Sequence, residues 1–117
     1  MRTKVLFDDV DASVSQESVE IQMDKRTDWD LVVTVDGLDG VPQIIIEKAY
    51  TGGGCLPGPS DWYAVENCNG DTFFDVDSPP LQIHKSQFTP NYFRIRLEPN
   101  TNTTGTVTAF LGYKDYP

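Results

Sequence analysis

The chain has few of the residues on which most enzyme active sites depend. Its 117 residues include one histidine, His84, and two cysteines, Cys55 and Cys68. Histidine is the commonest base beside a catalytic nucleophile. His84 lies between Ile83 and Lys85 in a strand-like segment, where a histidine usually faces solvent or has its hydrogen bonds satisfied. We therefore predict a protein that is not an enzyme and has no catalytic residues.

Positive charge is also scarce. The chain has 9 Lys and Arg residues against 18 Asp and Glu residues, which gives a net charge of −9. A surface of this sign repels nucleic-acid phosphates and anionic lipids at long range. We expect no direct nucleic-acid partner and no membrane partner.

Long apolar runs are absent as well. No segment approaches the roughly 20 apolar residues of a membrane-spanning helix. Asp8 arrives before any apolar stretch long enough for a signal peptide, which fits synthesis inside a cell. The length predicts one domain covering residues 1–117 with one core.

The pattern needed for a metal or a phosphate-bearing cofactor is missing. Cys55 and Cys68 could form a disulfide, although two free thiols are the simpler alternative for a domain with its own core. A zinc site would need further ligands, and His84 is the only histidine. The aspartate pairs at 9 and 11 and at 75 and 77 lack the pattern of an EF-hand calcium loop. We expect no metal and no cofactor.

What the sequence does contain is alternation of apolar and polar residues with a period of two, the pattern of half-buried strands. Little helix is expected. Eight or nine short strands with turn signals about every ten residues are typical of a β-sandwich or barrel. Uneven segment lengths favour the sandwich, so we predict a single-domain antiparallel β-sandwich, jelly-roll or immunoglobulin-like. The predicted strands are residues 4–7, 19–24, 29–35, 43–49, 62–66, 72–74, 81–84, 92–97 and 106–113.

Two pairs of strands stand out. Residues 29–35 and 43–49 are joined by a short segment with Gly37 and Gly40, which predicts a hairpin. Residues 92–97 and 106–113 form the clearest pair, joined by a polar turn. In the first of these, Phe93, Ile95 and Leu97 should face the core while the alternate residues face away.

A long surface loop is predicted over residues 51–61, which contain three consecutive glycines and two prolines. Aromatic residues flank it: Tyr50 precedes the loop, and Trp62 and Tyr63 follow it. These three side chains could form a platform for sugar rings or for a partner surface. The alternative is that alternate members, such as Trp62, fill the sandwich core.

The order of features from Trp29 onward resembles the small β-sandwich virion proteins of tailed bacteriophages that serve as head decoration, tail or other accessory structural proteins. The shared outline begins with a strand at 29–33, a hydrophobic strand at 44–48 and the step Asp61-Trp62. It ends with an aromatic-arginine strand at 91–97, a polar turn and a last strand at 106–113. The insertion at 51–60 and both cysteines depart from it.

The resemblance implies a non-enzymatic building block of a virion, made in the host cytoplasm and held by other virion proteins, with head decoration ahead of a tail or baseplate role. Because edge strands pair readily with other subunits, a homo-oligomer is expected. The rival hypothesis is a carbohydrate-binding module, free-standing or on a virion, that stacks host-surface glycans on Tyr50, Trp62 and Tyr63.

Overall fold

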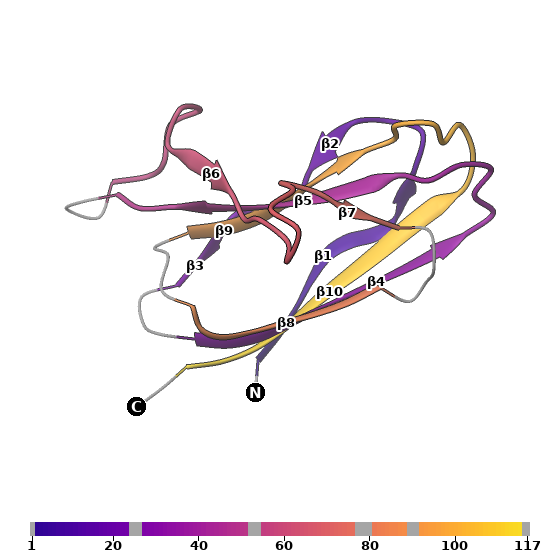
Figure 1. The fold of residues 1–117 in the computed structure, drawn as a ribbon. Coiled ribbons are helices and arrows are strands. Elements are labelled where there is room, and N and C mark those ends of the chain that lie inside the picture. Colours follow the sequence, from indigo (N-terminus) through magenta and orange to yellow (C-terminus); the bar gives the residue numbers. More distant parts are fainter. Residues whose placement is uncertain (1, 24–26, 52–54, 77–80, 89–91, 116–117) are drawn as a thin grey trace.

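The computed structural model describes residues 2–23, 27–51, 55–76, 81–88 and 92–115. Within these ranges the chain forms ten β-strands and no helix (Figure 1). The predicted all-β fold is confirmed, but there are ten strands rather than eight or nine, and three of them are ten residues long. The strands are β1 (Arg2–Asp11), β2 (Gln16–Glu17), β3 (Ile21–Gln22), β4 (Thr27–Asp36), β5 (Gln43–Ala49), β6 (Trp62–Ala64), β7 (Phe74–Asp75), β8 (Leu81–Phe88), β9 (Tyr92–Glu98) and β10 (Thr106–Asp115).

The strands form two antiparallel sheets that face each other. Sheet A has the order β1-β10-β4-β8, and sheet B has the order β2-β9-β5-β6, with β3 also on β9 and β7 also on β5. If β2 with β3 and β6 with β7 each count as one interrupted strand, eight strands remain. Their orders are then first-eighth-third-sixth and second-seventh-fourth-fifth. This is the arrangement of a jelly roll, which decides between the two sandwich types that the sequence left open.

The predicted hairpin of residues 29–35 with 43–49 is wrong. β4 lies in sheet A between β10 and β8, whereas β5 lies in sheet B against β9, β6 and β7. The pair formed by residues 92–97 and 106–113 is likewise split, with β9 in sheet B and β10 in sheet A. In both cases the chain crosses from one sheet to the other, so consecutive strands face each other across the core instead of sharing backbone hydrogen bonds.

The core consists of the two inward sheet faces. Phe93, Ile95 and Leu97 of β9 are fully buried, as the alternation predicted. Trp29 of β4 is also fully buried, and its ring meets that of Phe93 edge-on with the ring centroids 5.1 Å apart. Such aromatic pairs contribute about 0.5–1.5 kcal/mol beyond the burial of their surface. Trp29 is therefore the tryptophan that joins the two sheets.

One buried side chain connects three of the crossing segments. Asn102 is 3% exposed. Its Oδ1 accepts hydrogen bonds from the backbone N–H groups of Asp39 (3.0 Å) and Gly40 (3.1 Å). Its Nδ2 donates to the carbonyl oxygens of Ala12 (3.1 Å) and Thr104 (2.6 Å). The β1–β2, β4–β5 and β9–β10 connections are thus held together at one end of the sandwich.

The described residues include no helix long and apolar enough to cross a membrane.

Candidate functional site

The structure does not bring the three predicted platform residues together. Trp62 and Tyr63 are neighbours in β6, so their side chains point to opposite faces of sheet B. Trp62 lies opposite Ala49, and Tyr63 opposite Lys48. Tyr50 follows the end of β5 and is half exposed, with Lys48 Nζ 5.7 Å from the centre of its ring. Any aromatic site on the outer face of sheet B therefore depends on Trp62 without Tyr63.

Trp62 lies in a charged cluster instead of the hydrophobic core. The guanidinium carbon of Arg94 is 4.1 Å from the centre of the Trp62 ring. Arg94 Nε donates to Glu47 Oε1 at 2.9 Å, and its Nη1 donates to Glu17 Oε2 at 3.1 Å. One arginine of β9 thus contacts β2, β5 and β6, and the alternative of Trp62 as a core residue is wrong.

This cluster forms one wall of an open groove of about 420 Å³ on the outer face of sheet B. Residues 57–59 of the long loop form another wall, where the Gly58 N–H donates to Asp61 Oδ2 at 2.7 Å and shapes a tight turn. We call this hollow the sheet B groove; it is lined by Glu17, Glu20, Glu47, Pro57, Gly58, Pro59, Trp62, Arg94 and Arg96.

The charges in the sheet B groove are largely paired with one another. Glu47 is only 8% exposed, and its Oε1 is also 3.3 Å from Arg96 Nε. Three carboxylates face two guanidinium groups across the groove. The arrangement offers hydrogen-bond donors and acceptors beside an aromatic ring, which suits a neutral, hydroxyl-rich ligand better than an anion.

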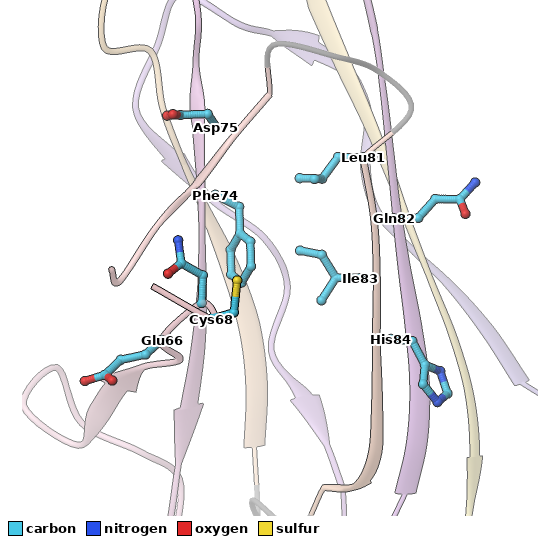
Figure 2. Close-up of a pocket in the computed structure, with 9 residues that line it drawn as sticks. Glu66, Cys68, Phe74, Asp75, Leu81, Gln82, Ile83 and His84 are labelled. Atoms are coloured by element: carbon cyan, nitrogen blue, oxygen red, sulfur yellow. The ribbon is translucent and has the colours of Figure 1, made fainter. Parts of the chain in front are cut away.

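A second hollow lies between the sheets on the side of β8, and we call it the seam crevice. Its volume is about 440 Å³. Figure 2 shows Phe74 of β7 facing Leu81 and Ile83 of β8 across it, while Gln82 and His84 point away on the other side of β8. The crevice is lined by Glu66, Asn67, Cys68, Phe74, Asp75, Leu81, Gln82, Ile83 and His84.

The two cysteines are both free and exposed in the structure. Cys68 belongs to the seam crevice, whereas Cys55 lies in the long loop, where its carbonyl oxygen accepts a hydrogen bond from the Thr51 hydroxyl at 2.6 Å. No disulfide joins them in this structure.

The outer face of sheet A carries the third feature, an apolar row. Val5 of β1, Phe110 of β10 and Val32 of β4 lie directly opposite one another across three adjacent strands. Val5 is 48% exposed and Phe110 is 38% exposed. Beside this row, His84 Nδ1 lies 2.7 Å from Asp30 Oδ1, and both side chains are exposed.

No protein-family model matches this chain, and no curated protein does either. The function is therefore inferred from the surfaces of the molecule itself.

No group of three or more potential metal ligands occurs among the described residues. Asp11 is used locally, since its Oδ1 accepts hydrogen bonds from the backbone N–H (2.9 Å) and hydroxyl (2.6 Å) of Ser13, and these bonds lower its pKa. Asp75 Oδ1 accepts a bond from Gln43 Nε2 at 3.2 Å. Asp77, the other member of the second aspartate pair, lies outside the described residues.

Sequence reasoning missed the partners of Trp62 and the apolar row. Arg94 and Glu47 are 47 positions apart, and they meet only because β9 and β5 are neighbours. The available signal was that arginines alternate with apolar residues in 92–97, which marked Arg94 as outward-facing without revealing what it would meet. Phe110 carried a similar signal, because it is the bulky apolar residue on the polar face of its strand.

Proposed function

We propose that this chain is a non-enzymatic structural protein of a phage-like virion, most simply a head decoration protein and otherwise a tail or baseplate accessory. In this proposal it is made in the host cytoplasm and becomes part of the particle by contacts with copies of itself and with other virion proteins.

The observation that carries the proposal is the apolar row of Val5, Phe110 and Val32, in which Val5 and Phe110 are exposed and Val32 is partly exposed. On a chain with a net charge of −9, apolar side chains in line across three strands of a regular sheet are a surface suited to protein contacts. The jelly roll is also an architecture of viral capsid proteins, though lectins share it. The resemblance from Trp29 onward adds to this support.

A non-enzymatic role is supported by the surroundings of the His84–Asp30 pair. Such a pair resembles the base and orienting group of a hydrolase, which also needs a nucleophile. In the described part of the chain, the hollow beside His84 on this face is lined by residues 30–32 and 82–84, which include no serine, threonine or cysteine. Cys68 lines the seam crevice on the other side of β8, and the His84 side chain points away from it (Figure 2).

The test is the mass of the protein in solution by light scattering, with and without reductant, followed by sedimentation with virions of the phage that encodes it. The parent chain is expected to form a defined oligomer and to bind the particles. Phe110→Lys should abolish these contacts with the fold intact. Leu56→Lys is the matched control, because Leu56 is an exposed apolar residue of the long loop. A strictly monomeric parent that ignores particles would contradict the proposal.

The second candidate is a glycan-binding module, which the sheet B groove favours because Trp62 lies there beside carboxylates and arginines. Trp62→Ala distinguishes it. A glycan array on which the parent binds and the folded variant does not would support the module, whereas no binding by the parent would remove this candidate.

A further inference from the structure

Sheet A has two edge strands, and one of them is protected against further pairing. The register of β1 against β10 shifts twice, between Val5 and Phe7 and again between Phe7 and Val10. Asp9 lies in the second irregular stretch with a φ of 53°. Lys4 and Asp8 add exposed charges. Irregular pairing and charged residues are the usual means by which an edge strand avoids joining another sheet.

The opposite edge, β8, has neither feature over residues 81–84, and Lys85 is its first lysine. Leu81 to Lys85 pair with β4 residue by residue, and the register shifts only beyond Lys85. Among the described strands, β4 alone pairs with β8. In an antiparallel edge strand the N–H and C=O groups of alternate residues point away from the sheet. The edges of sheet B are formed by strands of only two or three residues, so β8 is the longest regular edge in the described structure.

The seam crevice runs beside this edge. Figure 1 shows β8 in the lower sheet with β7 of the upper sheet above it. Figure 2 shows Leu81 and Ile83 of β8 pointing into the space that Phe74 faces from β7. All three side chains are only partly buried. The crevice volume of about 440 Å³ falls in the range of ligand-binding hollows.

We propose that β8 is a docking edge for an extended segment of a partner protein in which apolar residues alternate with basic ones. The segment would extend sheet A through backbone hydrogen bonds and place its apolar side chains in the seam crevice, the mode of binding known as β-strand addition. Side chains two residues apart on any strand are about 6.6 Å apart, so the apolar side chains of such a segment would follow the same repeat as Leu81 and Ile83 on β8.

Charge decides between a partner protein and a second copy of this chain. Neighbouring side chains on a strand point to opposite faces, so the basic side chains of such a segment would lie on the outer face of sheet A, on the side of the half-exposed Asp30 that pairs with His84. Glu66 and Asp75 border the crevice itself, and the whole chain has a net charge of −9. Two copies would bring like charges together, whereas a basic segment is attracted. The inference does not depend on the proposed virion role, since it rests on the edge and the crevice alone.

The probe is a synthetic peptide of about eight residues, close to the usual length of a strand, in which valine alternates with lysine. Added to ¹⁵N-labelled protein, it should slow hydrogen exchange at alternate backbone amides between Leu81 and Lys85 and shift the resonances of Phe74. Two control peptides have the same length: one places its valines and lysines in separate blocks, and the other replaces lysine with glutamate. Both should bind at least about tenfold more weakly.

Two sets of variants sharpen the test. Glu66→Lys with Asp75→Lys should weaken binding several-fold, whereas Asp8→Lys with Asp36→Lys makes the same change of net charge away from the crevice and should weaken it less. In a Cys55→Ser protein, the peptide should slow alkylation of Cys68, which lines the crevice. In a Cys68→Ser protein, the peptide should not change the rate at which Cys55 is alkylated.

Three outcomes would overturn the proposal. The first is an alternating peptide that leaves the β8 amides unprotected, and the second is a block peptide that protects them equally well. The third is a concentration-dependent dimer whose β8 amides are already protected without peptide, which would make a second copy the occupant. Failure of particle binding in the earlier test changes none of these readouts.

Discussion

The outer faces of the two sheets are stabilised in different ways. In sheet A, β4 and β10 pair over ten residues and β1 adds a third long strand, so backbone hydrogen bonds hold the sheet together. In sheet B, β5 and β9 are flanked by strands of two or three residues, and Arg94 links three of these strands through its side chain. Where the backbone ladder is long, outward side chains such as Phe110 are not needed to hold the strands together. Where it is short, charged side chains stabilise the fold.

The largest loss of stability should come from removing the side chain of Asn102, which holds together the connections between the two sheets. Asn102→Ala deletes four hydrogen bonds that hold three crossing connections, and it leaves buried or partly buried backbone groups without this partner. We expect a loss of about 3 kcal/mol in the free energy of unfolding, measured by urea denaturation. Asn69→Ala, at an exposed loop residue, is the control and should change stability by less than about 0.5 kcal/mol. Equal losses in the two variants would show that the hydrogen bonds of Asn102 do not stabilise the fold.

The second largest loss of stability is expected at Glu47, and it tests the difference between the outer faces of the two sheets. Glu47→Gln removes the carboxylate between Arg94 and Arg96, at a side chain that is mostly buried. Breaking a buried ion pair costs about 3–5 kcal/mol, and partial exposure here reduces the expected loss to about 2 kcal/mol. Asp30→Asn is the counterpart on sheet A. Its pair with His84 is half exposed, so we expect less than about 0.5 kcal/mol. Similar losses in the two denaturation curves would remove the distinction.

A smaller effect is expected at Trp62. Trp62→Ala removes the ring on which Arg94 stacks, and such cation–π contacts contribute about 0.5–1 kcal/mol at exposed sites. Tyr63→Ala, one residue away on the other face of β6, should change stability less. Thermal unfolding of both variants checks this order. A collapsed Trp62→Ala protein would mean that the ring is a core element after all.

The smallest effect concerns the pH dependence at the crossing loops. The hydroxyl and backbone N–H of Thr103 donate to the carboxylate of Asp39 and lower its pKa below the usual 3.8. A lowered pKa means that the charged form stabilises the fold above the unfolded-state pKa, and that this contribution is lost as the pH falls through the folded-state value. Asp39→Asn should therefore be less stable than the parent at pH 7, with the difference shrinking in acid. A difference that stays constant on acidification would contradict this role.

The sequence predicted where the strands lie better than it predicted which strands pair with one another. Alternation correctly placed Phe93, Ile95 and Leu97 in the core, because burial of one face depends on local sequence alone. The same alternation arises whether two strands share hydrogen bonds or face each other across a core, so β4 and β5 were wrongly paired. Leu6 and Phe7 broke the pattern for a physical reason: a register shift against β10 between Val5 and Phe7 allows both to be buried.

The candidate sites were less predictable still. The predicted platform assumed that Trp62 and Tyr63 act together, although neighbours on a strand must face opposite ways. The sheet B groove needs Glu17, Glu47 and Arg94, which come from three strands whose order the sequence did not reveal. The seam crevice depends on the distance between β7 and β8, and that distance follows from how the two sheets pack.

The position of β10 has a consequence for how the chain is made. This last strand lies in the interior of sheet A, between β1, the first strand, and β4. During synthesis β1 cannot pair with β10 until residues 106–115 have left the ribosome. Until then sheet A lacks one of its two inner strands. The domain should therefore complete its fold only once residues 106–115 have emerged, rather than in stages before then, and nascent chains halted before residue 106 should be degraded or should aggregate.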